Sequence, residues 1–106
     1  MLINKNSGIL VEKEIVDMKM VTGEEVVALV SKVEDDKVWL SKPCVIANTP
    51  KGPTMIKWLL MTNGDKDIEI SKDKIVAVGI PDSDIVDHYK ASTSPIAMAP
   101  AGLINT

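Results

Sequence analysis

Residues 14–40 read EIVDMKMVTGEEVVALVSKVEDDKVWL, and their pattern predicts three successive strands. Apolar residues alternate with charged ones from Val16 to Met20, which predicts a strand with one buried face. A short turn signal follows at residues 21–24. The run from Val26 to Val30 is apolar throughout, which is typical of a strand that is buried on both faces or that bends within a barrel. The polar residues 34–37 then predict a hairpin tip that leads into a third strand.

The third strand continues past Pro43. Proline has no N–H to donate, so the chain must form a sheet edge, a bulge or a bend at this point. A rigid, irregular loop is expected at residues 48–53, which contain two prolines and a glycine. A fourth strand is predicted for residues 55–61, and the Asn63-Gly64 pair after it is the strongest hairpin signal in the chain.

Two more strands and a helix complete the pattern. The alternating residues 67–70 and the apolar run 75–80 predict strands that are joined by a tight connection. The period then changes to that of a helix, with one apolar stripe formed by Ile85, Val86 and Tyr89.

This order of elements predicts an all-β fold. Short turns join sequential antiparallel strands, and five strongly bent strands close best as a barrel. We therefore predict a small five-stranded, strongly bent antiparallel barrel with a short C-terminal helix, which together span residues 1–91. Residues 92–106 are rich in Ala, Ser, Pro and Met and are predicted to be a flexible tail.

Composition limits the classes of function. A chain of 106 residues fits one domain, and its formal net charge is −3, whereas a non-specific DNA coat is normally basic. A local basic face on an oligomer is still compatible with this total, because fields follow the distribution of charge. All 12 basic residues are lysines, which excludes bidentate recognition of phosphate or guanine by arginine.

The cysteine count and the hydropathy pattern indicate the cellular compartment. Cys44 is the one cysteine, so neither a disulfide nor a Cys-rich zinc site is expected, and a reducing compartment is the simplest interpretation. The first residues, MLINKNSGILVEKE, lack the pattern of a secretory signal. No apolar stretch approaches the roughly 20 residues that span a bilayer, so we expect a cytoplasmic protein without a membrane partner.

No set of residues predicts catalysis. His88 is the one histidine, and it lies on the predicted helix without a Ser or Cys partner nearby. Asp82, Asp84 and Asp87 match the preference of helix starts for acidic residues, and their spacing is not that of a calcium loop. We expect no enzyme, no catalytic residue, no metal and no cofactor.

Three residues are candidate contacts for a nucleic acid. Trp39 lies between Val38 and Leu40 and therefore points to the opposite face of the strand. A base could stack on it there, and such a contact contributes roughly 1–3 kcal/mol. The alternative is that Trp39 packs against a neighbouring subunit or the helix. Lys72 and Lys74 lie at a tight turn, where they either grip phosphate or belong to an ordinary solvated turn.

The run Trp58-Leu59-Leu60-Met61 indicates an oligomer. An apolar strand beside a sheet edge is an aggregation hazard in a monomer, but it becomes an interface when a neighbour pairs with it. Repeated head-to-tail pairing of this kind closes a ring.

Residues 14–80 resemble the Sm-like (LSm) family. The segment 20–30, MVTGEEVVALV, is similar to the start of the family's first motif, which has a turn Gly and spaced apolar residues. The segment 35–40, DDKVWL, resembles the family's Asp-x-x-Met-Asn-Leu step, with Trp39 in place of the RNA-contacting Asn. The segment 72–78, KDKIVAV, lies where the second motif, Arg-Gly-x-Asn-hydrophobic, would fall. The compact, lysine-only chain is also similar to small phage or viral versions of this fold.

The resemblance implies a homo-oligomeric ring of about five to seven copies, joined through the fourth and fifth strands of the barrel. The residues that it places at the subunit interface are Trp58, Leu60, Ile75 and Ala77. It also implies that two hairpin tips line a pore, with nucleic-acid contacts from Lys37, Trp39, Lys72 and Lys74.

We therefore expect a ring that binds single-stranded RNA or DNA and acts in RNA or DNA processing. The alternative is an interaction or assembly module with the same barrel and no nucleic acid, which the acidic balance and the apolar tail favour.

Overall fold

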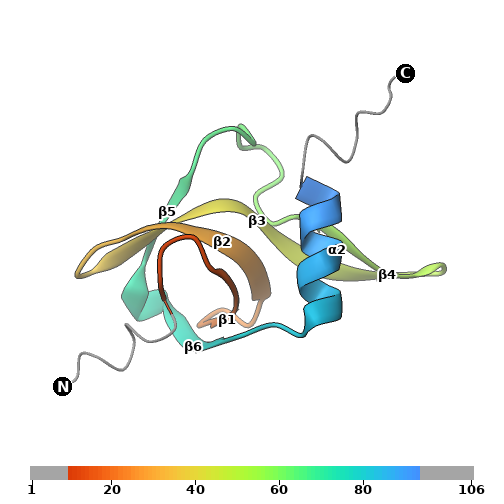
Figure 1. The fold of residues 1–106 in the computed structure, drawn as a ribbon, viewed down its shortest axis with the longest axis horizontal. Coiled ribbons are helices and arrows are strands. Elements are labelled where there is room, and N and C mark those ends of the chain that lie inside the picture. Colours follow the sequence, from red (N-terminus) through yellow and green to blue (C-terminus); the bar gives the residue numbers. More distant parts are fainter. Residues whose placement is uncertain (1–9, 94–106) are drawn as a thin grey trace.

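The computed structural model describes residues 10–93, and these form a bent antiparallel sheet with one helix beside it (Figure 1). The mainly β class is confirmed. The elements are β1 (Ile15–Met20), β2 (Glu25–Val33), β3 (Lys37–Thr49), β4 (Gly52–Lys57), β5 (Ile68–Ser71), the 3-10 turn η1 (Lys72–Lys74), β6 (Ile75–Gly79) and α2 (Ser83–Thr93).

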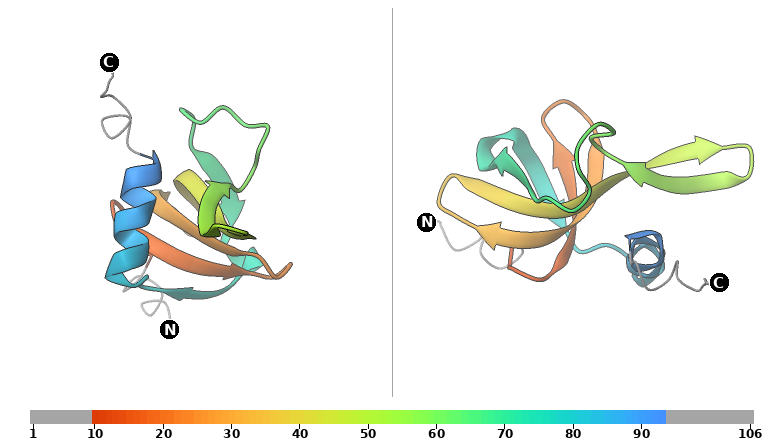
Figure 2. Two further views of the ribbon diagram at one scale, coloured as in Figure 1. Left: turned by 90° about the vertical axis from the view of Figure 1, so that its right-hand side faces the viewer. Right: turned by 90° about the horizontal axis from the view of Figure 1, so that it is seen from above.

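The long strand β3 organises the sheet. β2 pairs with one edge of β3, β1 pairs with β2, and β6 pairs with β1. The other edge of β3 has two partners, because β5 pairs with residues 37–40 and β4 pairs with residues 44–49. β4 and the end of β3 therefore project from the sheet as a two-stranded arm, residues 45–57, which is seen most clearly from above (Figure 2).

The sheet does not close into the predicted barrel. β5 and β6 follow one another through η1, but within residues 10–93 β5 pairs with β3 alone and β6 with β1 alone. The three residues of η1 redirect the chain instead of folding it back into a hairpin. Ile70 before the turn and Ile75 after it both pack against the main core, which fixes the two strands on different parts of the sheet. In the described part of the chain, one edge of β5 and one edge of β6 are therefore open.

The core has two parts, one on each face of β2. Val26 packs in the main core and its neighbour Val27 packs in a smaller cluster with Tyr89, so β2 is buried on both faces as predicted. The main core is built largely from alternate residues of the first three strands, as expected from their period of two. Its buried members are Leu10, Val16, Met18, Met20, Val26, Ala28, Val30, Val38 and Leu40.

The predicted irregularity at Pro43 is a β-bulge. The register of β2 against β3 shifts opposite residues 41–44, which leaves two residues of β3 without partners in the ladder. Lys42 at this bulge has a φ of 49°, in the left-handed region that lysine rarely adopts. The missing N–H of proline is thus accommodated where no ladder bond is needed.

Tyr89 attaches α2 to this bulge. Its hydroxyl accepts a hydrogen bond from the Leu29 N–H at 3.1 Å. It donates toward the Ser41 carbonyl at 2.8 Å, with the Lys42 carbonyl at 3.0 Å. The side chain is 4% exposed, and burial raises the pKa of Tyr89 to about 12, so the hydroxyl keeps its proton at neutral pH.

The prediction for the fourth strand was wrong in position. β4 ends at Lys57, and residues 58–67 leave the sheet as an irregular loop. The Asn63-Gly64 pair forms part of this loop and not a hairpin, and the Asn63 Oδ1 accepts a hydrogen bond from the Asp65 N–H at 2.8 Å. β4 and β5 lie one after the other on the same edge of β3, so the chain between them cannot fold back as a two-residue turn.

The helical spacing after residue 80 is confirmed, since Ile85 and Tyr89 of α2 both pack in the smaller cluster. Beyond Thr93, the predicted tail lies outside the described residues. Among residues 10–93, no helix has the length and apolar character needed to cross a membrane.

Candidate functional site

The structure brings the two predicted tips together. The Lys72 N–H donates a hydrogen bond to the Asp36 carbonyl at 2.9 Å, which joins η1 to the hairpin between β2 and β3. Lys37 is the register partner of Ser71, the residue before η1. Lys37, Trp39, Lys72 and Lys74 therefore belong to one region of the molecule, although they are separated by over thirty positions in sequence.

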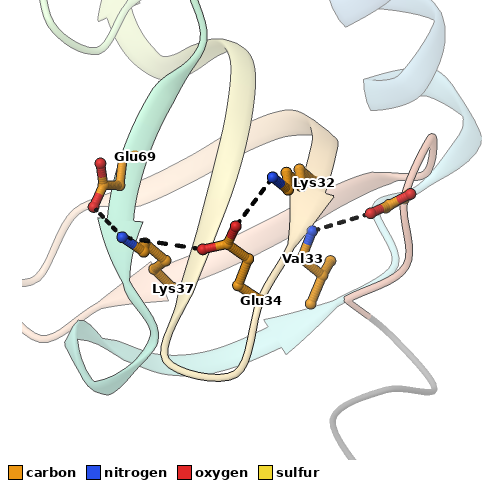
Figure 3. Close-up of polar contacts among 6 residues, drawn as sticks. Lys32, Val33, Glu34, Lys37 and Glu69 are labelled. Atoms are coloured by element: carbon orange, nitrogen blue, oxygen red, sulfur yellow. Dashed lines mark hydrogen bonds and ion pairs between the residues drawn. The ribbon is translucent and has the colours of Figure 1, made fainter.

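Lys37 is engaged in an ion-pair network and not free for a ligand (Figure 3). Its Nζ lies 3.1 Å from the Glu69 Oε2 and 4.0 Å from the Glu34 Oε1. Glu34 also pairs with Lys32 at 3.1 Å. The hydrogen bond to Glu69 and the charge of that carboxylate raise the pKa of Lys37 above its usual value. The side chain thus joins the β2–β3 hairpin to β5, and most of its charge is balanced within the protein.

Trp39 is half-buried on β3, where its register partners are Lys32 on β2 and Glu69 on β5. The indole Nε1 is buried and has no hydrogen-bond partner within residues 10–93. Only part of the ring is open to a stacking base. The half-buried ring is equally compatible with the alternative, in which Trp39 packs against a neighbouring subunit or the helix.

The side chains of Lys72 and Lys74 form fewer interactions than that of Lys37. Neither forms an ion pair in the described part of the chain, and Lys74 is exposed while Lys72 is half-buried. The backbone beneath them is held firmly, because the Lys74 carbonyl accepts a hydrogen bond from the Val21 N–H at 2.8 Å. Asp73 lies between them, so the turn carries two positive charges and one negative charge.

The predicted interface residues divide into two kinds. Trp58 and Ile75 pack against the protein's own main core, and Trp58 lies after the end of β4. Leu60 is 67% exposed and Ala77 is also exposed. Two further apolar residues in the same segment are open to solvent: Val76, which is 66% exposed, and Ile80, which is 69% exposed. Sequence reasoning missed these two because the run 75–80 gave no indication of which residues face the core.

Sequence analysis also missed a carboxyl pair on β1 and β2. One carboxyl oxygen of Asp17 is buried without a hydrogen-bond partner among residues 10–93. Burial, followed by the nearby Glu25 carboxyl, raises the pKa of Asp17 to about 7. The sequence pattern could not reveal this burial, because an acidic residue within an alternating strand is expected on the solvent face.

Residues 10–93 contain no group of three or more His, Cys, Asp or Glu side chains arranged to hold a metal ion. In comparisons with known proteins, no family model matches the chain and no curated protein matches its sequence. The resemblance to the Sm-like family therefore rests on the residue patterns described above.

Proposed function

We propose that this protein assembles head to tail into a closed, Sm-like ring that binds single-stranded nucleic acid. The pair of open strand edges is the observation that supports this most directly. Within residues 10–93, β5 is hydrogen-bonded to a partner strand on one side only, and so is β6. An open edge presents unpaired N–H and C=O groups to another chain. Two different edges on one molecule favour a heterologous contact, which forms a ring when its rotation closes.

The exposed apolar residues at β6 support the same contact. Val76, Ala77 and Ile80 lie on or directly after an open edge, where a neighbouring strand would cover them. Burying apolar surface contributes about 25 cal/mol per Å², so this edge is favourable for association. Trp58 and Ile75 then support the interface from within the core, while Leu60 and Ala77 are the members of the predicted set that are free to contact a neighbour.

Lys72 and Lys74 are the two proposed lysine contacts that form no ion pair within residues 10–93, and Lys74 is exposed while Lys72 is half-buried. They lie on η1, between the two open edges, so a ring would repeat them once per subunit around its axis. A single turn with one net positive charge binds phosphate weakly, and repetition provides the affinity. In this proposal Lys37 orders the neighbouring tip through Glu69, and Trp39 offers a partly open ring for stacking.

The test is binding of labelled oligouridine and oligothymidine of roughly 15 nucleotides, measured by fluorescence anisotropy at low and at physiological salt. The double variant Lys72→Glu/Lys74→Glu should lose about tenfold or more in affinity, with a reduced dependence on salt. The control is Lys51→Glu/Lys90→Glu, which makes the same change in net charge at exposed positions outside η1. Equal losses in the two variants would contradict a site at η1.

A protein-interaction module is the second candidate, and the loop 58–67 favours it. Leu60 is 67% exposed and Met61 is 97% exposed, and both are next to Leu59, which is 37% exposed. Together with a net charge of −3, this surface suits a protein partner better than a polyanion. Failure of every oligonucleotide to bind at low salt would favour this candidate.

A further inference from the structure

A pocket of about 310 Å³ lies between the base of the arm and the loop 58–67. Its walls come from β3, β4, the loop, the first residue of β5 and the end of α2. A volume of this size is typical of small-ligand sites, which begin near 300 Å³. The predicted contact residues Lys37, Trp39, Lys72 and Lys74 do not line it.

The charged groups of the pocket all have one sign. Three lysines line it, Lys42, Lys57 and Lys66, and no aspartate or glutamate does. The chain as a whole carries more acidic than basic residues, so this grouping departs from its surroundings. Three ammonium groups around one space repel each other, and an anion that enters the space relieves that repulsion.

Two of these lysines are held by the loop. The Lys42 Nζ donates a hydrogen bond to the Gly64 carbonyl at 3.0 Å, and the Lys57 Nζ donates one to the Thr62 carbonyl at 2.6 Å. Each ammonium group has three N–H donors, so two remain on each for a ligand. Lys66 forms no ion pair within residues 10–93. The result is a set of oriented cationic donors.

The backbone conformation of Lys42 is further evidence for a binding site at this pocket. Its φ of 49° is strained for lysine, and asparagine or glycine would adopt this conformation at lower cost. Bulges redirect side chains, and strained residues are concentrated at binding sites. Here the bulge places at the pocket a lysine that the fold itself does not favour.

The remaining lining is apolar and includes Met55, Ile56, Leu59 and Ile68. A ligand that fits both halves has an anionic group for the lysines and a flat, weakly polar part for the aliphatic side chains. We propose that this pocket binds a nucleoside phosphate, either as a free mononucleotide or as one unit of a single-stranded nucleic acid. The pocket is formed within one copy of the chain, so the inference does not depend on the ring or on η1.

The experiment is a titration of the full chain with uridine and adenosine monophosphates, the matching nucleosides, inorganic phosphate and the labelled oligonucleotides. Isothermal titration calorimetry measures the binding of the small ligands. Monophosphates should bind, and nucleosides should bind at least about tenfold more weakly. Lys57→Gln/Lys66→Gln should weaken monophosphate binding by about tenfold or more, and Lys51→Gln/Lys90→Gln should leave it unchanged.

The outcomes separate this pocket from the site at η1. Suppose that oligonucleotide binding is lost in Lys72→Glu/Lys74→Glu but stays intact in Lys57→Gln/Lys66→Gln. This result would contradict the claim that the pocket binds one unit of a single-stranded nucleic acid. If monophosphates also fail to bind at millimolar concentration, the pocket proposal is refuted entirely. Binding of monophosphates but not of oligonucleotides would identify a free nucleotide as the ligand.

Lys42→Asn provides a second readout that loss of folding cannot imitate. Asparagine tolerates the left-handed conformation better than lysine, but the variant also loses the hydrogen bond from the Lys42 Nζ to the Gly64 carbonyl. The two effects oppose each other, so the melting temperature should change by less than roughly 4 °C. The same variant should weaken monophosphate binding. A variant with a melting temperature close to that of the wild type and unchanged binding would show that Lys42 does not serve the pocket.

Discussion

Replacing Tyr89 with phenylalanine tests how the helix is attached to the sheet. The change removes one oxygen atom and keeps the ring that packs beside Val27 and Cys44. Without the hydroxyl, the Leu29 N–H and the Ser41 carbonyl both lose their hydrogen-bond partner. We therefore expect Tyr89→Phe to perturb polar pairing with almost no change in apolar burial.

The expected loss of stability in Tyr89→Phe follows from the Leu29 N–H and the Ser41 carbonyl. Leaving a buried polar group unsatisfied costs about 1–3 kcal/mol, and both groups here are only partly buried. We expect a loss of about 2 kcal/mol in the free energy of unfolding, against a total of about 5–15 kcal/mol for a domain of this kind. The melting temperature should fall by roughly 8–16 °C, since about 1 kcal/mol corresponds to 4–8 °C in a small domain.

The assay is urea denaturation followed by circular dichroism. Tyr89→Leu should cost more than Tyr89→Phe, because it also removes ring contacts in the smaller cluster. His88→Ala changes the adjacent, exposed residue and serves as the control, with an expected effect within about 0.5 kcal/mol. A loss below about 0.5 kcal/mol in Tyr89→Phe would refute the role given to the hydroxyl.

Two further predictions concern titration and turn geometry. The pKa of Asp17 is raised to about 7 in the fold, so the native state holds this proton more tightly than the unfolded chain does. The contribution of Asp17 to stability should therefore be complete below about pH 4 and should be lost as the pH rises to about 7, by on the order of 1 kcal/mol after allowance for solvent screening. Asp17→Asn should abolish this decrease in urea denaturation measured at several pH values, and an unchanged slope would contradict the assignment. Gly23→Ala should lower stability by roughly 1–2 kcal/mol, because the turn holds a φ of 106° that alanine rarely adopts. A Gly64→Ala control, where φ is not positive, should cost less, and equal losses would show that turn strain is not the cause.

Local sequence patterns predicted the strands well where each strand follows its neighbour in sequence. The alternation in β1 and the apolar run in β2 correspond directly to the two cores on either side of β2. The bulge was predictable too, because proline cannot contribute an N–H to the ladder. These features depend on the alternation of side chains along a strand and on short turns, and both can be recognised directly in a sequence.

The arm and the open edges were not predictable in this way. Whether residues 52–57 pair with the near or the far half of β3 depends on tertiary contacts, such as the packing of α2 beside β4. The Asn63-Gly64 signal was strong, but the position of β5 on the same edge of β3 overrode it. Barrel closure also failed as a prediction, because a 3-10 turn and a tight hairpin have similar polar sequences.

The candidate contacts show the same division. The resemblance to the Sm-like family implied that the two tips line a pore, and within one copy of the chain a hydrogen bond joins the Lys72 N–H to the Asp36 carbonyl. The sequence did not show that Lys37 is paired with Glu69, since the two residues are 32 positions apart. The three lysines of the pocket were equally hidden, because they lie on two strands and a loop that no local period connects.

Native mass spectrometry tests whether the chain assembles through the open edges of β5 and β6. We expect a closed assembly of about five to seven copies that persists on dilution. Val76→Lys, which places a charge on a side chain that is 66% exposed in the isolated chain, should yield folded monomers. A wild-type protein that is monomeric at every concentration would contradict the claim.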